Sequence, residues 1–235
     1  FRAARRQLNF SLQQQNFMMA LTHELKTPIA ITKLNLETLQ KRKLEEQQQQ
    51  RLIQTTLQEA NRLNSLCNNM LLSSQIEASG FKISEEEINF SELAGNCVQD
   101  FTVRYPDKKL TAAIHPDIFT NGDRLLLQMA VNNLVDNAIK YSPKETIIMV
   151  ELTQQKNNIY FLVKDEGKGI AAEEKKKVFD KFYRVGNTAT KGAKGTGLGL
   201  YLTKKIVQQH NGNISVTDNV PSGCIFTIVL QSSDK

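Results

Sequence analysis

The stretch GDRLLLQMAVNNLVDNAIKYSP, residues 122–143, decides how the second part of this 235-residue chain folds. Its apolar residues recur at helical spacing, Asp123 provides an N-cap side chain, and Pro143 stops the helix two residues after Tyr141. Segments with strand character lie on both sides of it: KLTAAI, TIIMVELTQ, NIYFLVKDE, NISVTDNV and CIFTIVLQ. Because strands and helices interleave, we predict an α+β two-layer sandwich, a layer of helices on a layer of sheet.

Two further helices and two hairpins complete this prediction. FSELAGNCVQDFTVRY is expected to form a helix with Ser91 as its N-cap, and a last helix is expected from about Gly197 to His210. TIIMVELTQ and NIYFLVKDE are expected to pair as a hairpin around Asn157 and Asn158. The last two strand segments are expected to form a second hairpin.

Residues 1–79 differ sharply in composition from residues 80–235. They contain no glycine and a single proline, Pro28, so we place the boundary between two domains there. Apolar residues that step by three or four predict two helices, with the polar stretch RKLEEQQQQR as the turn. Each helix carries one apolar stripe, so we expect an all-α hairpin that forms a dimeric four-helix bundle with a second copy; burial against the second domain is the alternative. The stripes consist of Leu21, Leu25, Ile29, Thr32, Leu36 and Leu39, and of Ile53, Leu57, Ala60, Leu63, Cys67 and Met70.

Composition limits the partners and the compartment. The net charge is +6, but basic and acidic residues are mixed along the chain, which argues against a nucleic-acid partner. Cys67, Cys97 and Cys224 lie far apart, which favours buried thiols over a disulfide framework or a zinc site. No apolar run approaches the ~18 residues of a membrane span. The basic opening FRAARRQLNF is expected of a segment that lies just cytoplasmic of a membrane helix; a solvated helix end is the alternative.

Glycines mark a candidate ligand site. Seven of the twelve lie between Gly167 and Gly199, and five of these seven fall in the clusters DEGKGI (165–170) and GTGLGL (195–200). Glycine lets a ligand approach the main chain, and the second cluster leads into a helix whose first N–H groups attract phosphate. The clusters match neither the phosphate loop GxxxxGK[ST] nor the dinucleotide motif GxGxxG, and the HRD and DFG motifs of serine/threonine kinases are absent.

Polar residues on the helix of residues 122–143 point to the same ligand. Asn133, Asn137 and Lys140 are spaced by four and three, which places them near one face. Asparagine is unfavourable inside a helix unless its amide has a partner. An amide oxygen suits Mg²⁺ bound together with nucleotide phosphates, and a lysine supplies a counter-charge. Exposed polar residues without a ligand are the alternative.

Five motifs together make a specific resemblance. HELKTP, NNLVDNAIKYSP, DEGKGI, FDKFYR and GTGLGLYLTKKIV follow one another in the order and spacing of the sensor histidine kinases of two-component systems. They extend from about Phe17 to Gly223 and so cover most of the chain. The resemblance implies a dimerisation and histidine phosphotransfer domain followed by an ATP-binding domain of the histidine kinase/GHKL ATPase type.

The resemblance also implies roles in binding ATP and Mg²⁺. Asp165 would accept a hydrogen bond from the adenine amino group, and Asn137 would ligate Mg²⁺. Residues 185–194 would form a mobile lid, with Phe179 and Phe182 at its base. Arg184 would contact the γ-phosphate. The remaining residues that it assigns to ATP are Asn133, Lys140, Tyr141, Gly167, Gly169, Gly195, Gly197, Leu198 and Gly199.

The motif HELKTP carries the predicted phosphoacceptor. His23 follows Leu21 by two residues, about 200° round a helix, so its ring is expected to point away from the seam and to act as the nucleophile. HELKT lacks the second histidine of the zinc motif HExxH. Glu24 is expected to face outward too and to take the proton, while Thr27, by resemblance, would orient a water for dephosphorylation. Pro28 removes a backbone hydrogen bond and predicts a bend beside this site.

The predicted function is ATP-dependent autophosphorylation of His23, followed by transfer to an aspartate of a response-regulator receiver domain. The resemblance adds phosphatase activity toward that regulator. One alternative is a clamp-type ATPase of the gyrase, mismatch-repair or heat-shock chaperone class, which lacks HELKTP on a preceding hairpin. Another is a dimeric scaffold that only binds, which would lack His23, Asn137 or a motif glycine; none of these is missing.

Overall fold

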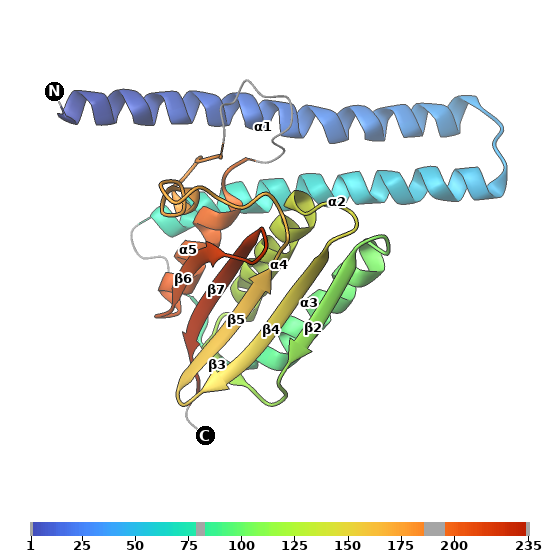
Figure 1. The fold of residues 1–235 in the computed structure, drawn as a ribbon. Helices are drawn as coiled ribbons and strands as arrows, with labels where there is room; N and C mark the ends of the chain where they lie inside the picture. Colours follow the sequence, from blue (N-terminus) through green and yellow to red (C-terminus); the bar gives the residue numbers. More distant parts are fainter. Residues whose placement is uncertain (1, 79–82, 186–195, 234–235) are drawn as a thin grey trace. The chain divides into compact units, whose positions relative to one another are not determined.

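The computed structural model describes residues 2–78, 83–185 and 196–233 (Figure 1). The chain divides into two compact units, one of residues 1–78 with 181–198 and one of residues 79–180 with 199–235. The predicted boundary falls at residues 79 and 80, outside the described residues, and stays a prediction. None of the helices in the described ranges combines the length and the apolar composition that a membrane span needs.

The first unit contains the predicted helical hairpin. Helix α1 runs from Arg2 to Lys41 and α2 from Glu46 to Glu77. The turn was predicted too broadly: it is confined to residues 42–45, and the glutamine run lies inside α2, because glutamine is a good helix former. α1 continues through Pro28, and Asn35 on α1 donates to the Thr56 hydroxyl on α2 at 3.3 Å.

The predicted stripe on α1 is buried only in part. Leu21 is buried, at 4% exposed, whereas Ile29 and Leu36 are more than half exposed. On α2, Leu57 is 59% exposed. Ile29, Leu36 and Leu63 line an open apolar groove of about 490 Å³ that lies along the hairpin. A single hairpin therefore leaves much of its predicted seam uncovered, which is a reason to look for an apolar partner.

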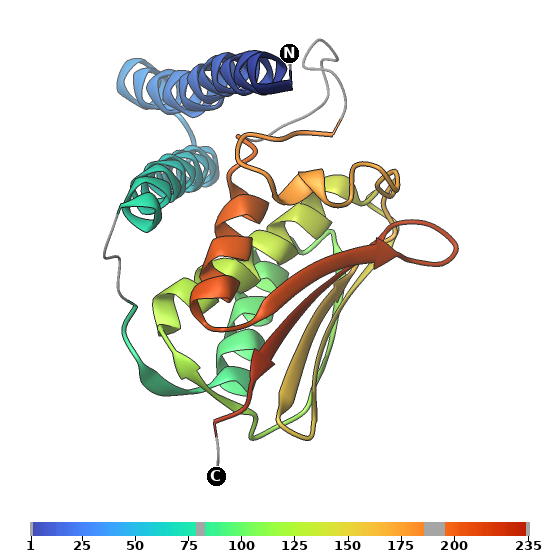
Figure 2. The same ribbon diagram turned by 90° about the vertical axis from the view of Figure 1, so that its left-hand side faces the viewer.

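The second unit is the predicted α+β two-layer sandwich. In its described part, a five-stranded sheet has the order β2-β4-β5-β7-β6, with β2 parallel to β4 and the other pairs antiparallel. Figure 2 shows the helices together on one side of this sheet. The elements are α3 (Phe90–Arg104), β2 (Lys109–Ile114), α4 (Arg124–Tyr141), β4 (Ile147–Gln155), β5 (Asn158–Lys164), α5 (Gly199–Gln209), β6 (Asn213–Asp218) and β7 (Cys224–Gln231).

Alternating residues of the central strands build the core. Burial alternates along β4, β5 and β7, as expected for strands with one face against helices. Leu134 of α4 and Leu202 of α5 are fully buried. The buried strand residues are Ile148, Val150, Leu152, Ile159, Phe161, Val163, Phe226, Ile228 and Leu230.

Several local predictions were wrong. The N-cap of α3 is Asn89, whose side chain accepts from the Glu92 N–H, while the Ser91 hydroxyl donates to the carbonyl of His115. A short antiparallel pair, β1 (Glu86–Asn89) with β3 (Phe119–Gly122), was missed, and a 3₁₀ turn (Lys177–Phe179) follows the first glycine cluster. The β4–β5 hairpin turns at Lys156 and Asn157, one residue earlier than predicted, and α5 begins at Gly199.

Two of the three cysteines match the predicted environment. Cys97 and Cys224 are buried, and burial raises the pKa of each thiol to about 11, so both remain protonated at neutral pH. Cys67 was predicted to be buried in the apolar stripe of α2, but it is exposed.

A buried histidine joins the start of α4 to the end of α5. The His210 ring accepts a hydrogen bond at Nε2 from the Asp123 N–H, 2.9 Å, and its Nδ1 lies 2.7 Å from the Ile206 carbonyl oxygen. Because Nε2 accepts, the proton resides on Nδ1 and is donated to Ile206. Gly122 makes room for this ring, since a Cβ at that position would overlap it.

We predict that Gly122→Ala lowers the free energy of unfolding by about 1–3 kcal/mol, because the added methyl group forces the His210 ring out of place. Urea denaturation followed by circular dichroism measures the change. Gly95→Ala is the matched control: a Cβ there meets nothing within 4 Å inside α3, so it should raise stability by about 0.5–1 kcal/mol. Equal stabilities for the two variants would contradict the packing argument.

Candidate functional site

Asp165 follows β5 directly and is held by the main chain. Its side chain is buried, and Oδ1 accepts from the N–H groups of Gly167, 2.8 Å, and Cys224, 3.3 Å. Its own N–H donates to the Cys224 carbonyl at 2.9 Å. Burial raises the pKa of the Asp165 carboxyl, and the two backbone hydrogen bonds to Oδ1 offset part of that rise. The arrangement fixes one carboxylate oxygen and the orientation of the other.

The first glycine cluster keeps the space beside this carboxylate open. A Cβ on Gly167 would lie 2.8 Å from Asp165 Oδ1 and 2.9 Å from the Tyr141 carbonyl oxygen, so a side chain does not fit. Gly169 has φ +73°, a conformation that favours glycine. A flat ligand can therefore approach the main chain beside Asp165, which fits a purine base.

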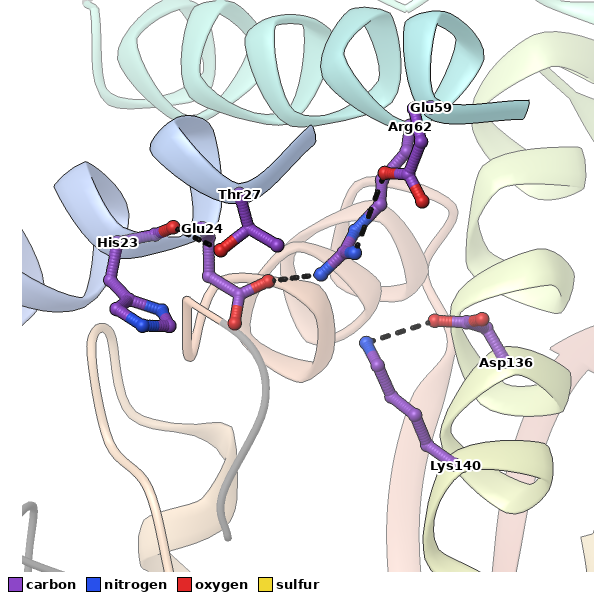
Figure 3. A network of polar contacts seen from close by, with 7 residues as sticks. All are labelled: His23, Glu24, Thr27, Glu59, Arg62, Asp136 and Lys140. Carbon is purple, nitrogen blue, oxygen red and sulfur yellow. Dashed lines mark hydrogen bonds and ion pairs between the residues drawn. The ribbon is translucent and has the colours of Figure 1, made fainter. Parts of the chain in front are cut away.

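The polar face of α4 was predicted to hold metal and phosphate. Asn133 and Asn137 are half-buried, and the Asn133 amide donates to the Gly199 carbonyl at 3.3 Å, which leaves its side-chain oxygen as an acceptor. Lys140 forms an ion pair of 3.2 Å with Asp136 on the same helix (Figure 3). Asn133 thus joins α4 to the first residue of α5. Amide oxygens beside a lysine fit Mg²⁺ that is bound together with phosphate.

The second glycine cluster is described only in part. Gly195 and residues 186–194 of the predicted lid lie outside the described residues. Phe182 donates its N–H to the Gly197 carbonyl at 3.1 Å, which joins two residues that flank the predicted lid in the sequence. Gly197 has φ +71°, and Leu198 is buried.

Other predicted lid and nucleotide residues have distinct environments. Phe179 is buried with its ring edge-on to Phe226, and Phe182 stacks on Phe17 within the first unit, with ring centroids 4.0 Å apart. Arg184 is half-buried, and Tyr141 is 46% exposed. The residues of the predicted site fall into both units: Arg184, Gly197 and Leu198 belong to the first, and the other described ATP-binding and metal residues to the second.

The predicted phosphoacceptor lies on the open surface of the hairpin. His23 and Thr27 are both exposed on α1, as predicted from the helical period. The Thr27 hydroxyl donates to the His23 carbonyl at 3.1 Å, which is the i to i−4 bond available to threonine in a helix (Figure 3).

Glu24 does not face outward, and that prediction was wrong. It is 8% exposed, and its Oε2 lies 2.5 Å from a guanidinium nitrogen of Arg62 on α2 (Figure 3). Glu59 lies 3.8 Å from another nitrogen of the same guanidinium. Glu24 follows Leu21 by three residues and therefore shares its buried face. Arg62 was missed because its partner lies 38 residues away in the sequence.

The Cys224 backbone is a second part of the site that the sequence did not indicate. The one signal was Gly223, which has φ +105° and comes so close to Asp165 that a Cβ would overlap the Asp165 carbonyl oxygen. A glycine that precedes a strand is common in turns, so this signal is weak without the strand register.

We predict that Asp165→Asn raises the melting temperature of the nucleotide-free protein at pH 7. The folded-state pKa of Asp165 lies above its ordinary value of 3.8, so the ionised carboxylate lowers stability at neutral pH. This penalty disappears as the pH falls through the folded-state pKa, and the difference between variant and wild type should shrink toward pH 4.

Differential scanning fluorimetry across this pH range measures the effect. The control is Asp107→Asn, at an exposed position, which should leave the melting temperature unchanged. A lower melting temperature for Asp165→Asn at pH 7 would contradict the assigned cost of burial.

Two family models match the chain. Residues 13–79 match the model described as "His Kinase A (phospho-acceptor) domain". Residues 122–234 match the model described as "Histidine kinase-, DNA gyrase B-, and HSP90-like ATPase". The first range contains His23, and the second contains Asp165 and the asparagines of α4.

Curated relatives match along nearly the whole chain. It is 34% identical over 230 residues to "Sensor protein CiaH" of Streptococcus pneumoniae, an alignment that covers 93% of this chain and 49% of that protein. It is 31% identical over 222 residues to "Heme sensor protein HssS" of Staphylococcus haemolyticus, covering 94% of this chain and 48% of that protein. The chain therefore spans about half the length of the curated relatives it matches.

Solved structures show the same fold. The Acinetobacter baumannii histidine kinase AdeS matches with a TM-score of 0.64 and 25% identity, over 90% of this chain and 98% of that one. The mycobacterial sensor histidine kinase MprB matches with a TM-score of 0.57 and 29% identity, over 64% of this chain and 99% of that one.

Proposed function

This chain belongs to the sensor histidine kinases of two-component systems, and from that premise we propose that it transfers the γ-phosphoryl group of ATP to His23. The observation that supports this most strongly is the exposure of His23 on a hairpin that matches the phosphoacceptor model. The group would then pass to an aspartate of a response-regulator receiver domain.

Asp165 would select the base. Its Oδ1 is taken by two backbone N–H groups, so Oδ2 remains to accept a hydrogen bond from the adenine amino group. Guanine presents a carbonyl oxygen in that position, and two acceptors would repel each other. Gly167 and Gly169 would let the base lie against the main chain.

The face of α4 and the start of α5 would hold the phosphates. Mg²⁺ would be held by the Asn137 amide oxygen, with Asn133 beside it, and would neutralise phosphate charge. Lys140 would contact a phosphate, and Tyr141 the sugar or base side of the nucleotide. Arg184, Gly195, Gly197, Leu198 and Gly199 would complete the phosphate contacts.

The transfer itself needs a nucleophile and a proton acceptor. A nitrogen of the His23 ring would attack the γ-phosphorus, forming a P–N bond, while the bond to the bridging oxygen breaks and ADP leaves. The ring proton would go to Glu24. Because Arg62 holds the Glu24 carboxylate on the buried side of α1, Glu24 would have to exchange that partner for the ring.

The proposal includes a homodimer and a second activity. The exposed apolar residues along the hairpin, among them Ile29, Leu36 and Leu57, suit burial against a second copy in a four-helix bundle. Thr27, exposed one turn from His23, would orient a water that dephosphorylates the regulator. In the full-length protein, this core would lie on the cytoplasmic side of a bacterial inner membrane, anchored upstream of residue 1.

We predict that His23→Ala abolishes the incorporation of phosphate from [γ-³²P]ATP but leaves nucleotide affinity unchanged, because His23 is not among the residues assigned to nucleotide binding. The label on the wild type should be labile in acid and stable in base, as expected for a phosphoramidate. Thr22→Ala, at a neighbouring exposed position, is the control and should still be labelled. Persistent labelling of the His23 variant would overturn the assignment, and hydrolysis without any label would favour a clamp-type ATPase.

We predict that Asn137→Ala weakens Mg-ATP binding at least tenfold, because the loss of a metal ligand removes a charge-assisted contact of about 1.5–3 kcal/mol. Titration calorimetry with and without Mg²⁺ measures the effect. Asn132→Ala, which removes another half-buried asparagine of α4, is the control and should keep the wild-type Mg-ATP affinity. Unchanged Mg-ATP affinity in the Asn137 variant would remove Asn137 from the metal site.

A further inference from the structure

The turn between β6 and β7, residues 219–223, is bound to Asp165 by more than the strand ladder. The Asn219 side chain donates from Nδ2 to the Asp165 carbonyl oxygen at 2.9 Å. Its Oδ1 accepts from the Val220 N–H at 3.0 Å, and its own N–H donates to the Gly223 carbonyl at 3.1 Å. A backbone N–H can only donate, so the contact with Val220 assigns the amide oxygen and directs the NH₂ group to Asp165.

Every polar group of Asp165 except one oxygen is therefore engaged. The N–H donates to Cys224, the carbonyl accepts from Asn219, and Oδ1 accepts from Cys224 and Gly167. Within the part of the chain that the structure describes, no hydrogen bond reaches Oδ2. Among the described residues, Oδ2 is not one of the buried side-chain atoms that lack a partner, so solvent reaches it and a ligand with an N–H group can donate to it.

The Asn219 side chain holds the main chain just beyond the end of β5, where the pairing with β7 stops. β5 ends at Lys164, and its pairing with β7 ends at Ile225, so the Asp165 carbonyl lies beyond the last described pair. Gly223 comes so close to this carbonyl that a side chain would overlap it. Among the described residues, the Asn219 amide is the one donor across the turn to the Asp165 carbonyl, so without it the peptide that follows Asp165 can tilt and reorient the carboxylate.

We propose that Asn219 is a positioning residue that sets the preference of this site for purine nucleotides with a 6-amino group. It holds the Asp165 main chain so that Oδ2 points at the amino group. The inference rests on the proposed function, since it requires Asp165 to contact adenine. Asn219 itself touches no part of the nucleotide.

The test compares two nucleotides that differ by one group: ATP and purine riboside triphosphate, which lacks the 6-amino group. Titration calorimetry on the whole chain with Mg²⁺ gives both Kd values. In Asn219→Ala, the Kd of ATP should rise about five- to tenfold, whereas that of the analogue should change less than about twofold. The Kd of the analogue divided by the Kd of ATP, which measures the preference for the 6-amino group, therefore falls. A general loss of structure would weaken the binding of both nucleotides and leave this ratio unchanged.

Two further variants make the result specific. Asn219→Asp keeps the size of the side chain and the contact with Val220 but removes the donor to Asp165, so it should also lower the ratio of the analogue Kd to the ATP Kd. This variant replaces Asn219→Ala in the test if the alanine variant does not fold. Ser222→Ala, an exposed residue of the same turn, is the control and should keep the wild-type ratio. A folded Asn219 variant that keeps the wild-type ratio, or that weakens both nucleotides equally, overturns the inference.

The same measurements separate this inference from the proposed function. If Asp165→Asn loses the preference for ATP and the Asn219 variants keep it, only the role of Asn219 fails. If the wild type binds the two nucleotides equally, Asp165 does not read the amino group, and both the base-reading role and the inference fall.

Discussion

The pairing of β5 with β7 is the interaction on which the candidate nucleotide site depends. A carboxylate in the protein interior is unfavourable unless hydrogen bonds replace its water, and Asp165 obtains one of its two backbone donors from the residue that starts β7. The hydrogen bond from the Asp165 N–H to Cys224 continues the ladder that pairs Lys164 with Ile225. A slip of one residue in β7 would turn every side chain of that strand to the other face and remove Cys224 from Asp165. The site is therefore a consequence of sheet register.

The helices of the second unit support the same site from the other layer. Asn133 joins α4 to the first residue of α5, and His210 joins the last turn of α5 to the N-cap of α4. Polar contacts thus tie α5 to α4 at both ends of α5, while apolar side chains such as Leu134 and Leu202 fill the space between the helices and the sheet. A side chain that also serves as a structural tie leaves little freedom for substitution. This explains why a polar residue at position 133 is tolerated inside an apolar helix.

Features set by local rules could be predicted from the sequence, and features set by distant partners could not. The cap at Asp123, the helix α4 and the exposure of His23 follow from spacing along one segment. Ser91 was a plausible cap, but Asn89 takes that role because the Ser91 hydroxyl is committed to the loop that ends at Ile118. The inward turn of Glu24 depends on Arg62, and the hold on Asp165 depends on Cys224 and Asn219; none of these pairs is near in sequence.

The neighbouring residues His23 and Glu24 show how helical geometry can separate two groups that the proposed phosphoryl transfer needs together. Successive side chains on a helix diverge by roughly 100°, so one residue faces solvent while the next faces α2. The Arg62 guanidinium lies 2.5 Å from Oε2 of the nearly buried Glu24 carboxylate, so it occupies the oxygen that would receive the ring proton in the proposed transfer. Arg62 therefore holds the proposed proton acceptor on the face of α1 that packs against α2, whereas His23 is exposed. Any motion of α1 relative to α2 that lengthens this ion pair would remove the Arg62 contact from Oε2 of Glu24, the residue next to the proposed nucleophile.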